Sequence, residues 1–330
     1  MVFPFFFLMS FLVFLGSMLS ISSCSWFGVW SGLELNMLCF LPIVMNFSSF
    51  MGVESVVKYF LIQSFGSVGV LMGGLFEDSF IFHFFDFFFF FLCLSLFLKV
   101  GVFPFHWWLP GVLSGLNWLG VIFLSTWQKL APILVFSSFG SCGFFFLLIC
   151  VFSSFVGGVS GIGQTSVRTI LAFSSIGHAG WIFSLFCVSW FFGFVYFFIY
   201  FISTFFLVFF FWCMDYYRVS QVFSFSLINC FFFYLRSFCI WYSSFFGVFS
   251  KLFGFIAFSS LSFGFFFLLI LILGSLFSLY FYLGLFFTCF FFFFTFLENI
   301  QSKFYLLLFF SLFSIFVSFS IFLLIIFFIC

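Results

Sequence analysis

Apolar runs of about twenty residues recur along this 330-residue sequence, and they limit its fold more than any other feature. A helix needs about 20 mostly apolar residues to cross the hydrocarbon core of a bilayer. In lipid, every backbone amide needs a partner within the protein, and only helices and closed barrels provide one. Continuous runs do not fit the alternating pattern of barrel strands. The sequence therefore predicts an all-α, polytopic membrane protein.

The scarcity of charge supports lipid as the solvent and removes other classes of function. Only 5% of the residues are charged and 67% are hydrophobic, whereas about a quarter of the residues are charged in a typical soluble domain. The formal net charge of +1 leaves no basic patch or acidic tail. We therefore expect no nucleic-acid partner and no electrostatically steered soluble partner.

The apolar runs predict about eleven spans, near residues 3–23, 27–47, 57–76, 80–115, 117–138, 140–158, 167–186, 189–213, 222–258, 262–290 and 304–328. The fourth and the ninth are too long for one crossing and contain polar or helix-breaking residues. We expect two interrupted helices there. No stretch reads as a soluble domain, so residues 1–330 are expected to form a single transmembrane domain.

Four charged residues fall inside predicted spans: Glu34, Lys99, Lys129 and Lys251. A charge at the centre of a spanning helix costs about 2.5 to 3.5 kcal/mol on insertion scales, so each one needs a partner or a function. A single lysine near a span end can instead extend its amine to the headgroups. That alternative is a poor account of all four together.

The chemistry of these four residues suits proton transfer. Burial favours the neutral form of both lysine and carboxyl groups, and an approaching acid–base partner restores both charges. We expect Glu34 and Lys99 to face each other directly or through water, with Lys129 and Lys251 continuing the line. Because no acid of this chain remains for Lys129, we expect it to be less ion-paired than Lys99.

The stretch from Lys99 to Pro110 places Gly101, Pro104 and His106 where a helix would otherwise continue. Two prolines and a glycine predict a break. A broken helix is tolerated at membrane depth only where it is buried in protein or lines a hydrated cavity, and transporters use such breaks in ion pathways. His106 is therefore a candidate proton relay, and a histidine that simply bonds a free carbonyl is the alternative.

Two further polar groups lie on predicted helices. His178 shares a helical side with Ser174 and Ser175, which indicates either packing between helices or a path for protons. Glu54 and Lys58 have the i, i+4 spacing of an ion pair at a helix start, and we interpret them as an interfacial salt bridge.

No cofactor or metal site is predicted on this chain. The eleven cysteines are scattered, without a C-x-x-C pair or a histidine at ligand spacing. The glycines at 157, 158, 161 and 163 do not match the dinucleotide-binding fingerprint, and no Walker loop occurs.

Several stretches, taken in order, resemble the subunit 2 family of NADH dehydrogenase, one of three antiporter-like subunits in the membrane arm of respiratory complex I. The specific matches cover residues 30–36, 57–61, 99–112, 126–132 and 163–181, and weaker ones follow at 246–251 and 275–282. The buried acid and lysines of that family fall on Glu34, Lys99, Lys129 and Lys251. The runs of phenylalanine also resemble chains encoded by T-rich mitochondrial genomes.

The resemblance implies a multi-pass subunit of about eleven helices in the mitochondrial inner membrane. It implies a part of the proton-translocating NADH:ubiquinone reductase that carries no redox centre and moves protons when quinone is reduced elsewhere. NADH, FMN, iron–sulfur clusters and ubiquinone would bind other subunits. The partners would be the other membrane-arm subunits, including neighbouring antiporter-like subunits, and membrane lipids.

The sequence departs from the family where prolines normally precede the last lysine. We still expect a break before Lys251, because the stretch from Phe231 to Ser259 exceeds one crossing and contains Arg236 and several hydroxyl side chains. We also expect Lys251 to point into the protein.

Two alternatives to a proton-translocating complex I subunit remain. One is a cation/proton antiporter subunit outside complex I, which copurification with other complex I subunits would exclude. The other is a passive scaffold in the membrane arm, which would predict normal pumping after Lys129→Met.

Overall fold

The computed structural model describes residues 2–45, 50–78, 85–139, 143–214, 217, 250–259 and 264–297. In this part of the chain every regular element is a helix, as the sequence predicts. The helices are α1 (Val2–Ser22), α2 (Trp26–Met45), α3 (Phe50–Asp78), α4 (Phe85–Val100), α5 (Trp108–Gly115), α6 (Trp118–Ser125), α7 (Trp127–Ser137), α8 (Phe144–Gly161), α9 (Val167–Val188), α10 (Trp190–Met214) and α12 (Gly264–Leu297). A helical segment at Ser250–Ser259 precedes α12.

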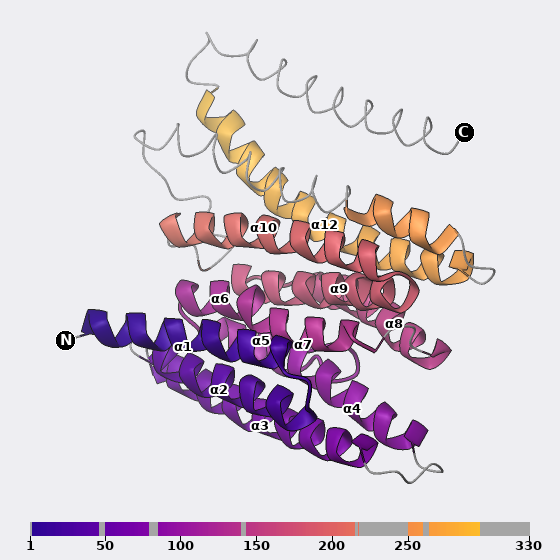
Figure 1. The fold of residues 1–330 in the computed structure, drawn as a ribbon. Helices are drawn as coiled ribbons and strands as arrows, with labels where there is room; N and C mark the ends of the chain where they lie inside the picture. Colours follow the sequence, from indigo (N-terminus) through magenta and orange to yellow (C-terminus); the bar gives the residue numbers. More distant parts are fainter. Residues whose placement is uncertain are drawn as a thin grey trace.

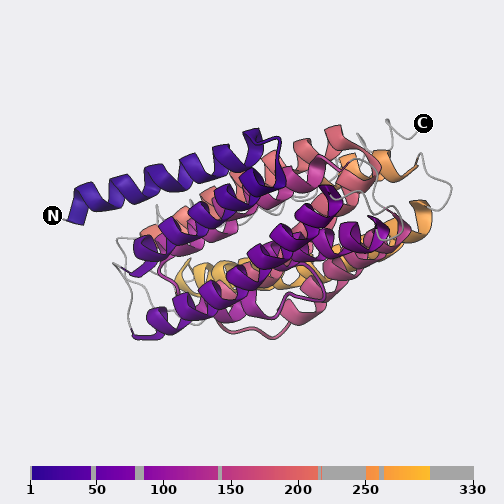
Figure 2. The same ribbon diagram turned by 60° about the horizontal axis from the view of Figure 1, so that its bottom comes forward.

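The helices lie side by side as a bundle with roughly aligned long axes, α1 to α3 at one end and α10 and α12 at the other (Figures 1 and 2). Within the described ranges, eight spans are long and apolar enough to cross a membrane. Helix α7 packs against α1, α2, α4 and α6, and α9 packs against α5, α6, α8, α10 and α12. Helices α7 and α9 therefore lie at the centre of the bundle.

The predicted break in the fourth span is confirmed. Helix α4 ends at Val100, and Gly101 follows with a φ of 82°, a left-handed conformation that glycine adopts without strain. The amide of Gly101 donates to Leu98 and that of Val102 donates to Phe97, the bonding pattern of a Schellman motif. The chain then runs through residues 101–107 before α5 begins at Trp108.

A second break, which the sequence analysis missed, divides the fifth span between α6 and α7. The junction is Thr126, with φ −114° and ψ −74°, and its hydroxyl donates to the Ile122 carbonyl at 2.6 Å. The neighbouring Ser125 hydroxyl also bonds back, to Val121 at 2.7 Å. Side chains that bond back to i−4 carbonyls weaken and bend helices, so this pair of residues was the available signal.

Several predicted boundaries need correction. Helix α3 begins at Phe50 rather than near residue 57. The Glu54–Lys58 pair therefore lies within the helix. Helix α12 extends to Leu297, beyond the expected end at 290. The predicted span at 304–328, and the proposed break before Lys251 with Arg236, lie outside the described residues.

Glycines allow the closest helix contacts around the second half of the bundle. A Cβ atom added to Gly158 of α8 would lie 2.3 Å from the Gly274 carbonyl oxygen of α12, and one on Gly274 would lie 2.5 Å from the Ser154 carbonyl oxygen. Real Cβ contacts of this length do not occur, so these backbones approach each other only because both residues are glycine. The contact fixes α12 against α8.

Candidate functional site

Glu34 lies near the middle of α2 and faces the interior of the bundle. Its Oε2 atom is buried and has no hydrogen-bond partner among the described residues. It interacts electrostatically with Lys99 and Tyr59. An unpaired buried carboxylate oxygen is costly, so this position suits a hydrogen bond from a water molecule.

Glu34 and Lys99, both of which the structure describes, do not form a direct ion pair. Within the described ranges the one carboxylate–lysine salt bridge is Lys58–Glu54 on α3, at 2.6 Å with both side chains about half exposed. The Glu54–Lys58 pair is thus confirmed as a salt bridge. Of the two expected arrangements of Glu34 and Lys99, direct or through water, the direct ion pair is not formed. Their connection through water stays a prediction.

Lys99 sits in the last turn of α4, where a cation interacts favourably with the helix dipole. Its side chain is only 6% exposed. The carbonyl oxygen of Lys99 accepts a hydrogen bond from Gln63 Nε2 of α3 at 3.0 Å, and that of Leu98 accepts from Trp108 Nε1 at 3.1 Å. The carbonyls of Leu98 and Lys99 at the end of α4 therefore both have hydrogen-bond donors from other helices.

A small cavity connects Lys99 with Lys129. Its lining includes both lysines together with Tyr59, Gln63 and Gln128. The cavity has a volume of about 10 Å³, enough for about one water molecule. We call this space the Lys99–Lys129 cavity.

Lys129, on α7, is buried to 3% exposure and has no carboxylate within salt-bridge distance among the described residues. Its Nζ atom donates to the Ser175 carbonyl of α9 at 3.1 Å and lies 5.6 Å from the centre of the Tyr200 ring. Lys99 has Glu34 as an electrostatic partner. Since neither lysine forms a carboxylate salt bridge among the described residues, the lower degree of ion pairing expected for Lys129 stays a prediction.

His178, one turn after Ser174 and Ser175 on α9, continues the line beyond Lys129. Its Nδ1 atom is hydrogen-bonded to Tyr196 Oη of α10 at 2.9 Å. The imidazole interacts electrostatically with both Lys129 and Lys251. Lys129 bonds the Ser175 carbonyl of the same helix as His178, and Lys251 lines a cavity together with His178.

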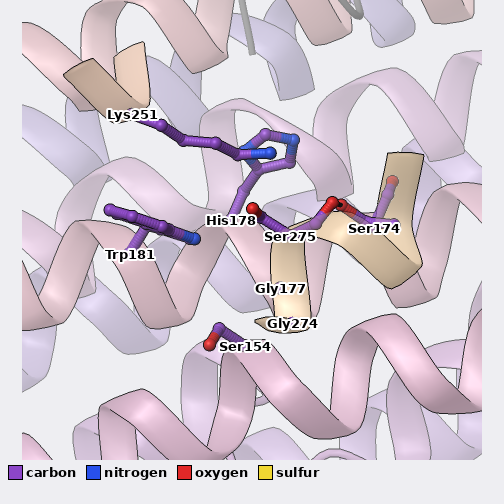
Figure 3. A pocket seen from close by; sticks show the side chains of 9 residues that line it. Ser154, Ser174, Gly177, His178, Trp181, Lys251, Gly274 and Ser275 are labelled. Atoms are coloured by element: carbon purple, nitrogen blue, oxygen red, sulfur yellow. Dashed lines mark hydrogen bonds between the residues drawn. The ribbon is translucent and has the colours of Figure 1, made fainter. Parts of the chain in front are cut away.

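A second cavity, which we call the Lys251 cavity, adjoins His178. Its volume is also about 10 Å³. Figure 3 shows Lys251 extending toward His178, with Trp181 beside it and serines from α8, α9 and α12 around the space. The expectation that Lys251 points into the protein is confirmed. The hydroxyls of Ser154, Ser174 and Ser275 donate to their own helices, so they offer acceptor lone pairs to the cavity.

His106 does not join this line. It lies in the break between α4 and α5, is 4% exposed, and lines neither cavity. Its ring packs against Phe103 and Trp107, and its Nδ1 has no hydrogen-bond partner among the described residues. The structure thus brings Lys99 and Lys129 to one cavity and His178 and Lys251 to the other, with Glu34 interacting with Lys99, whereas His106 lines neither cavity.

Sequence reasoning missed two polar elements. Arg168, at the start of α9, donates to the Ser114 carbonyl at 3.1 Å and stacks on the rings of Trp118 and Tyr217. An uncharged network next to the Lys99–Lys129 cavity consists of Asn36, Tyr59 and Gln128. Arg168 and Gln128 both stand in the quoted family stretches, and that was the available signal.

The fold and the site together define a polytopic helical membrane protein with buried ionisable side chains aligned between water-sized cavities. A model of the transmembrane family of NADH:quinone oxidoreductases and Mrp antiporters matches residues 23–246, about two thirds of the chain. The chain belongs to this family.

Curated relatives carry the name NADH-ubiquinone oxidoreductase chain 2. The protein of Anopheles gambiae is 38% identical over 161 residues, 47% of each chain. That of Pisaster ochraceus is 42% identical over 159 residues, 46% of this chain and 45% of the relative. That of Aedes aegypti is 32% identical over 219 residues, which are 65% of this chain and 64% of the relative. The chain spans about half to two thirds of the length of the curated relatives it matches.

Solved structures share the fold at low identity. A chain of respiratory complex I from Thermus thermophilus superposes with a TM-score of 0.73 at 19% identity, over 86% of this chain and 70% of that one. A chain of an Mrp complex from a Dietzia species superposes with a TM-score of 0.68 at 15% identity. The match covers 82% of this chain and 58% of that one. An antiporter-like fold is therefore established.

Proposed function

We propose that the chain is the antiporter-like subunit 2 of respiratory complex I, a multi-pass subunit of the mitochondrial inner membrane. It moves protons across the membrane while quinone is reduced elsewhere in the complex, and it carries no redox centre. NADH, FMN, iron–sulfur clusters and ubiquinone bind other subunits. Residues 1–330 act as one transmembrane domain, next to other membrane-arm subunits and lipid.

The relatives named NADH-ubiquinone oxidoreductase chain 2 support the assignment to the complex. The observation that carries the function is the Lys99–Lys129 cavity, because it joins two buried cations through a space of water size without a carboxylate among its described lining residues. A proton can cross such a space along a bridging water. His178 and the Lys251 cavity extend the same route.

Each residue has a role in this route. Glu34 and Lys99 form the first acid–base pair, which exchanges a proton as their interaction strengthens or weakens. Lys129 holds the proton at the centre, where it is restrained by a backbone carbonyl rather than by an acid. His178 passes it toward Lys251. His106, outside the line, has no assigned step.

The test is Lys129→Met in the assembled complex reconstituted into vesicles. We expect protons translocated per NADH oxidised to fall, with the complex assembled normally. Lys58→Met is the matched control, because Lys58 is about half exposed outside the bundle. Normal pumping by Lys129→Met would overturn the proposal and favour the alternative of a passive scaffold in the membrane arm.

Membership in the complex has its own test. A tagged chain purified in mild detergent should bring along the other membrane-arm subunits and NADH:ubiquinone reductase activity. Recovery of the chain with a cation/proton antiporter assembly instead would contradict the assignment to complex I.

A further inference from the structure

The Gln128 side chain is held at both ends of its amide next to the Lys99–Lys129 cavity. Tyr59 Oη of α3 donates to Gln128 Oε1 at 3.2 Å, and Gln128 Nε2 donates to Asn36 Oδ1 of α2 at 3.0 Å. Three helices thereby fix one amide directly beside Lys129. These two hydrogen bonds fix the orientation of the amide.

The charges around the cavity are unbalanced. Two lysines line it, and among the described lining residues no carboxylate does. The groups that can accept hydrogen bonds there are neutral, namely Gln128 Oε1, Tyr59 Oη and the Oε1 atom of Gln63, whose Nε2 is used by the Lys99 carbonyl. A water molecule in a protein cavity needs two to four polar partners. The cavity lining provides two amines together with amide and phenol oxygens.

We propose that Gln128 is a positioning residue that orients the water molecule through which Lys99 and Lys129 exchange a proton. This inference rests on the proposed function. The water accepts from one lysine and donates to the amide oxygen, which turns its second hydrogen toward the other lysine. No covalent bond of the protein changes, and the proton moves between nitrogen and water oxygen.

The choice of an amide rather than an acid follows from the two lysines. A carboxylate at position 128 would pair with a neighbouring ammonium and hold its proton, because opposite charges attract strongly in a poorly solvated site. An amide oxygen accepts the same hydrogen bond without fixing the charge. Gln128 therefore keeps the water in place and leaves the lysines free to change state.

Gln128→Glu separates this role from packing, because the two side chains have the same shape. Tyr59, Lys99 and Lys129 are the titratable groups around the new carboxyl, with Glu34 acting through Tyr59 and Lys99. We expect at least a fivefold fall in protons translocated per NADH at neutral pH. Pumping should recover as the pH falls, because a protonated carboxyl again offers one acceptor and one donor.

Gln128→Met is the second variant and removes the polar atoms without adding charge. It should pump poorly at every pH. Gln164→Glu is the matched control for both the substitution and the pH series, since Gln164 Nε2 bonds the Ser160 carbonyl at 3.3 Å, away from both cavities. The control should follow the parent complex throughout.

Parental pumping by Gln128→Glu or Gln128→Met would overturn the positioning role, as would a loss in Gln128→Glu that does not change with pH. The Lys129→Met complex is measured alongside them. If that variant pumps normally, the proposed function itself fails. If it does not pump while the Gln128 variants do, only the role of Gln128 is wrong.

Discussion

Lys129 Nζ and the backbone carbonyl oxygen of Ser175 are 3.1 Å apart and hydrogen-bonded across α7 and α9. A carbonyl oxygen has a second lone pair, so Ser175 can accept this bond and still take part in its own helix. Both an ammonium and a neutral amine can donate to it. The bond can therefore position Lys129 in either protonation state.

Lys129→Arg should abolish pumping although it keeps the positive charge and the donor. A guanidinium stays charged in proteins and cannot release its proton to a neighbour. We expect assembled complex with few protons translocated per NADH oxidised, measured in reconstituted vesicles. Pumping at the parental level would mean that a fixed charge is sufficient at this position.

Tyr200→Phe tests the support of the unexpected break at Thr126. Tyr200 Oη donates to the Ser125 carbonyl at 3.0 Å, and the ring lies beneath Lys129. Phenylalanine keeps the ring but leaves a buried carbonyl without this donor, at a cost of about 1 to 3 kcal/mol. Thermal inactivation of the purified complex should occur at a lower temperature, while the protons translocated per NADH stay unchanged.

The control for this substitution is Tyr280→Phe on α12, where the side chain is largely exposed. It removes the same hydroxyl group without uncovering a buried acceptor. Equal loss of thermal stability in the two variants would show that the Ser125 contact does not stabilise the break.

The break after Lys99 could be predicted from the sequence because its causes are local. Gly101 adopts the left-handed conformation that ends α4, and Pro104 prevents the helix from continuing directly after it, whereas Pro110 lies in the first turn of α5, where proline is tolerated. The burial of Lys129 could be predicted for a similar reason, since the length of its apolar run determines its depth. These conclusions needed no knowledge of neighbouring helices.

The partners of the buried charges could not be predicted in the same way. Counting acids and bases paired Glu34 with Lys99, directly or through water, but it did not indicate that Gln63, Tyr59 and Gln128 line the Lys99–Lys129 cavity. Which neutral side chain reaches a cation depends on how separate helices pack. The period of hydrophobic residues along one helix does not contain that information.

Gly274→Ala should force α12 away from α8. The added Cβ atom would lie 2.5 Å from the Ser154 carbonyl oxygen, which belongs to a helix backbone and cannot move alone. Overpacking of this kind costs about 1 to 3 kcal/mol. Since Gly274 and Ser275 both line the Lys251 cavity, we expect a less stable complex and slower pumping, measured by thermal inactivation and vesicle acidification.

Gly284→Ala is the matched control on the same helix, because a Cβ atom there would meet nothing within 4 Å. Alanine in place of an exposed helical glycine removes backbone entropy from the unfolded chain, so this variant should be as stable as the parent or slightly more stable. A defect in Gly284→Ala as large as that in Gly274→Ala would contradict the close contact of α8 and α12.

Tyr196→Phe should slow pumping by about threefold to tenfold, corresponding to the loss of one hydrogen bond of about 1 kcal/mol at a transferring group. Tyr196 is fully buried, and its hydroxyl holds His178 Nδ1 at 2.9 Å. A phenol both donates and accepts, so this bond can persist when the imidazole gains or loses a proton. Without it, His178 loses the contact that orients its ring at the Lys251 cavity. The rate of NADH-driven proton uptake should fall while assembly of the complex is unchanged. The control Tyr280→Phe should match the parent. A parental rate in Tyr196→Phe would show that the ring orientation of His178 does not limit proton transfer.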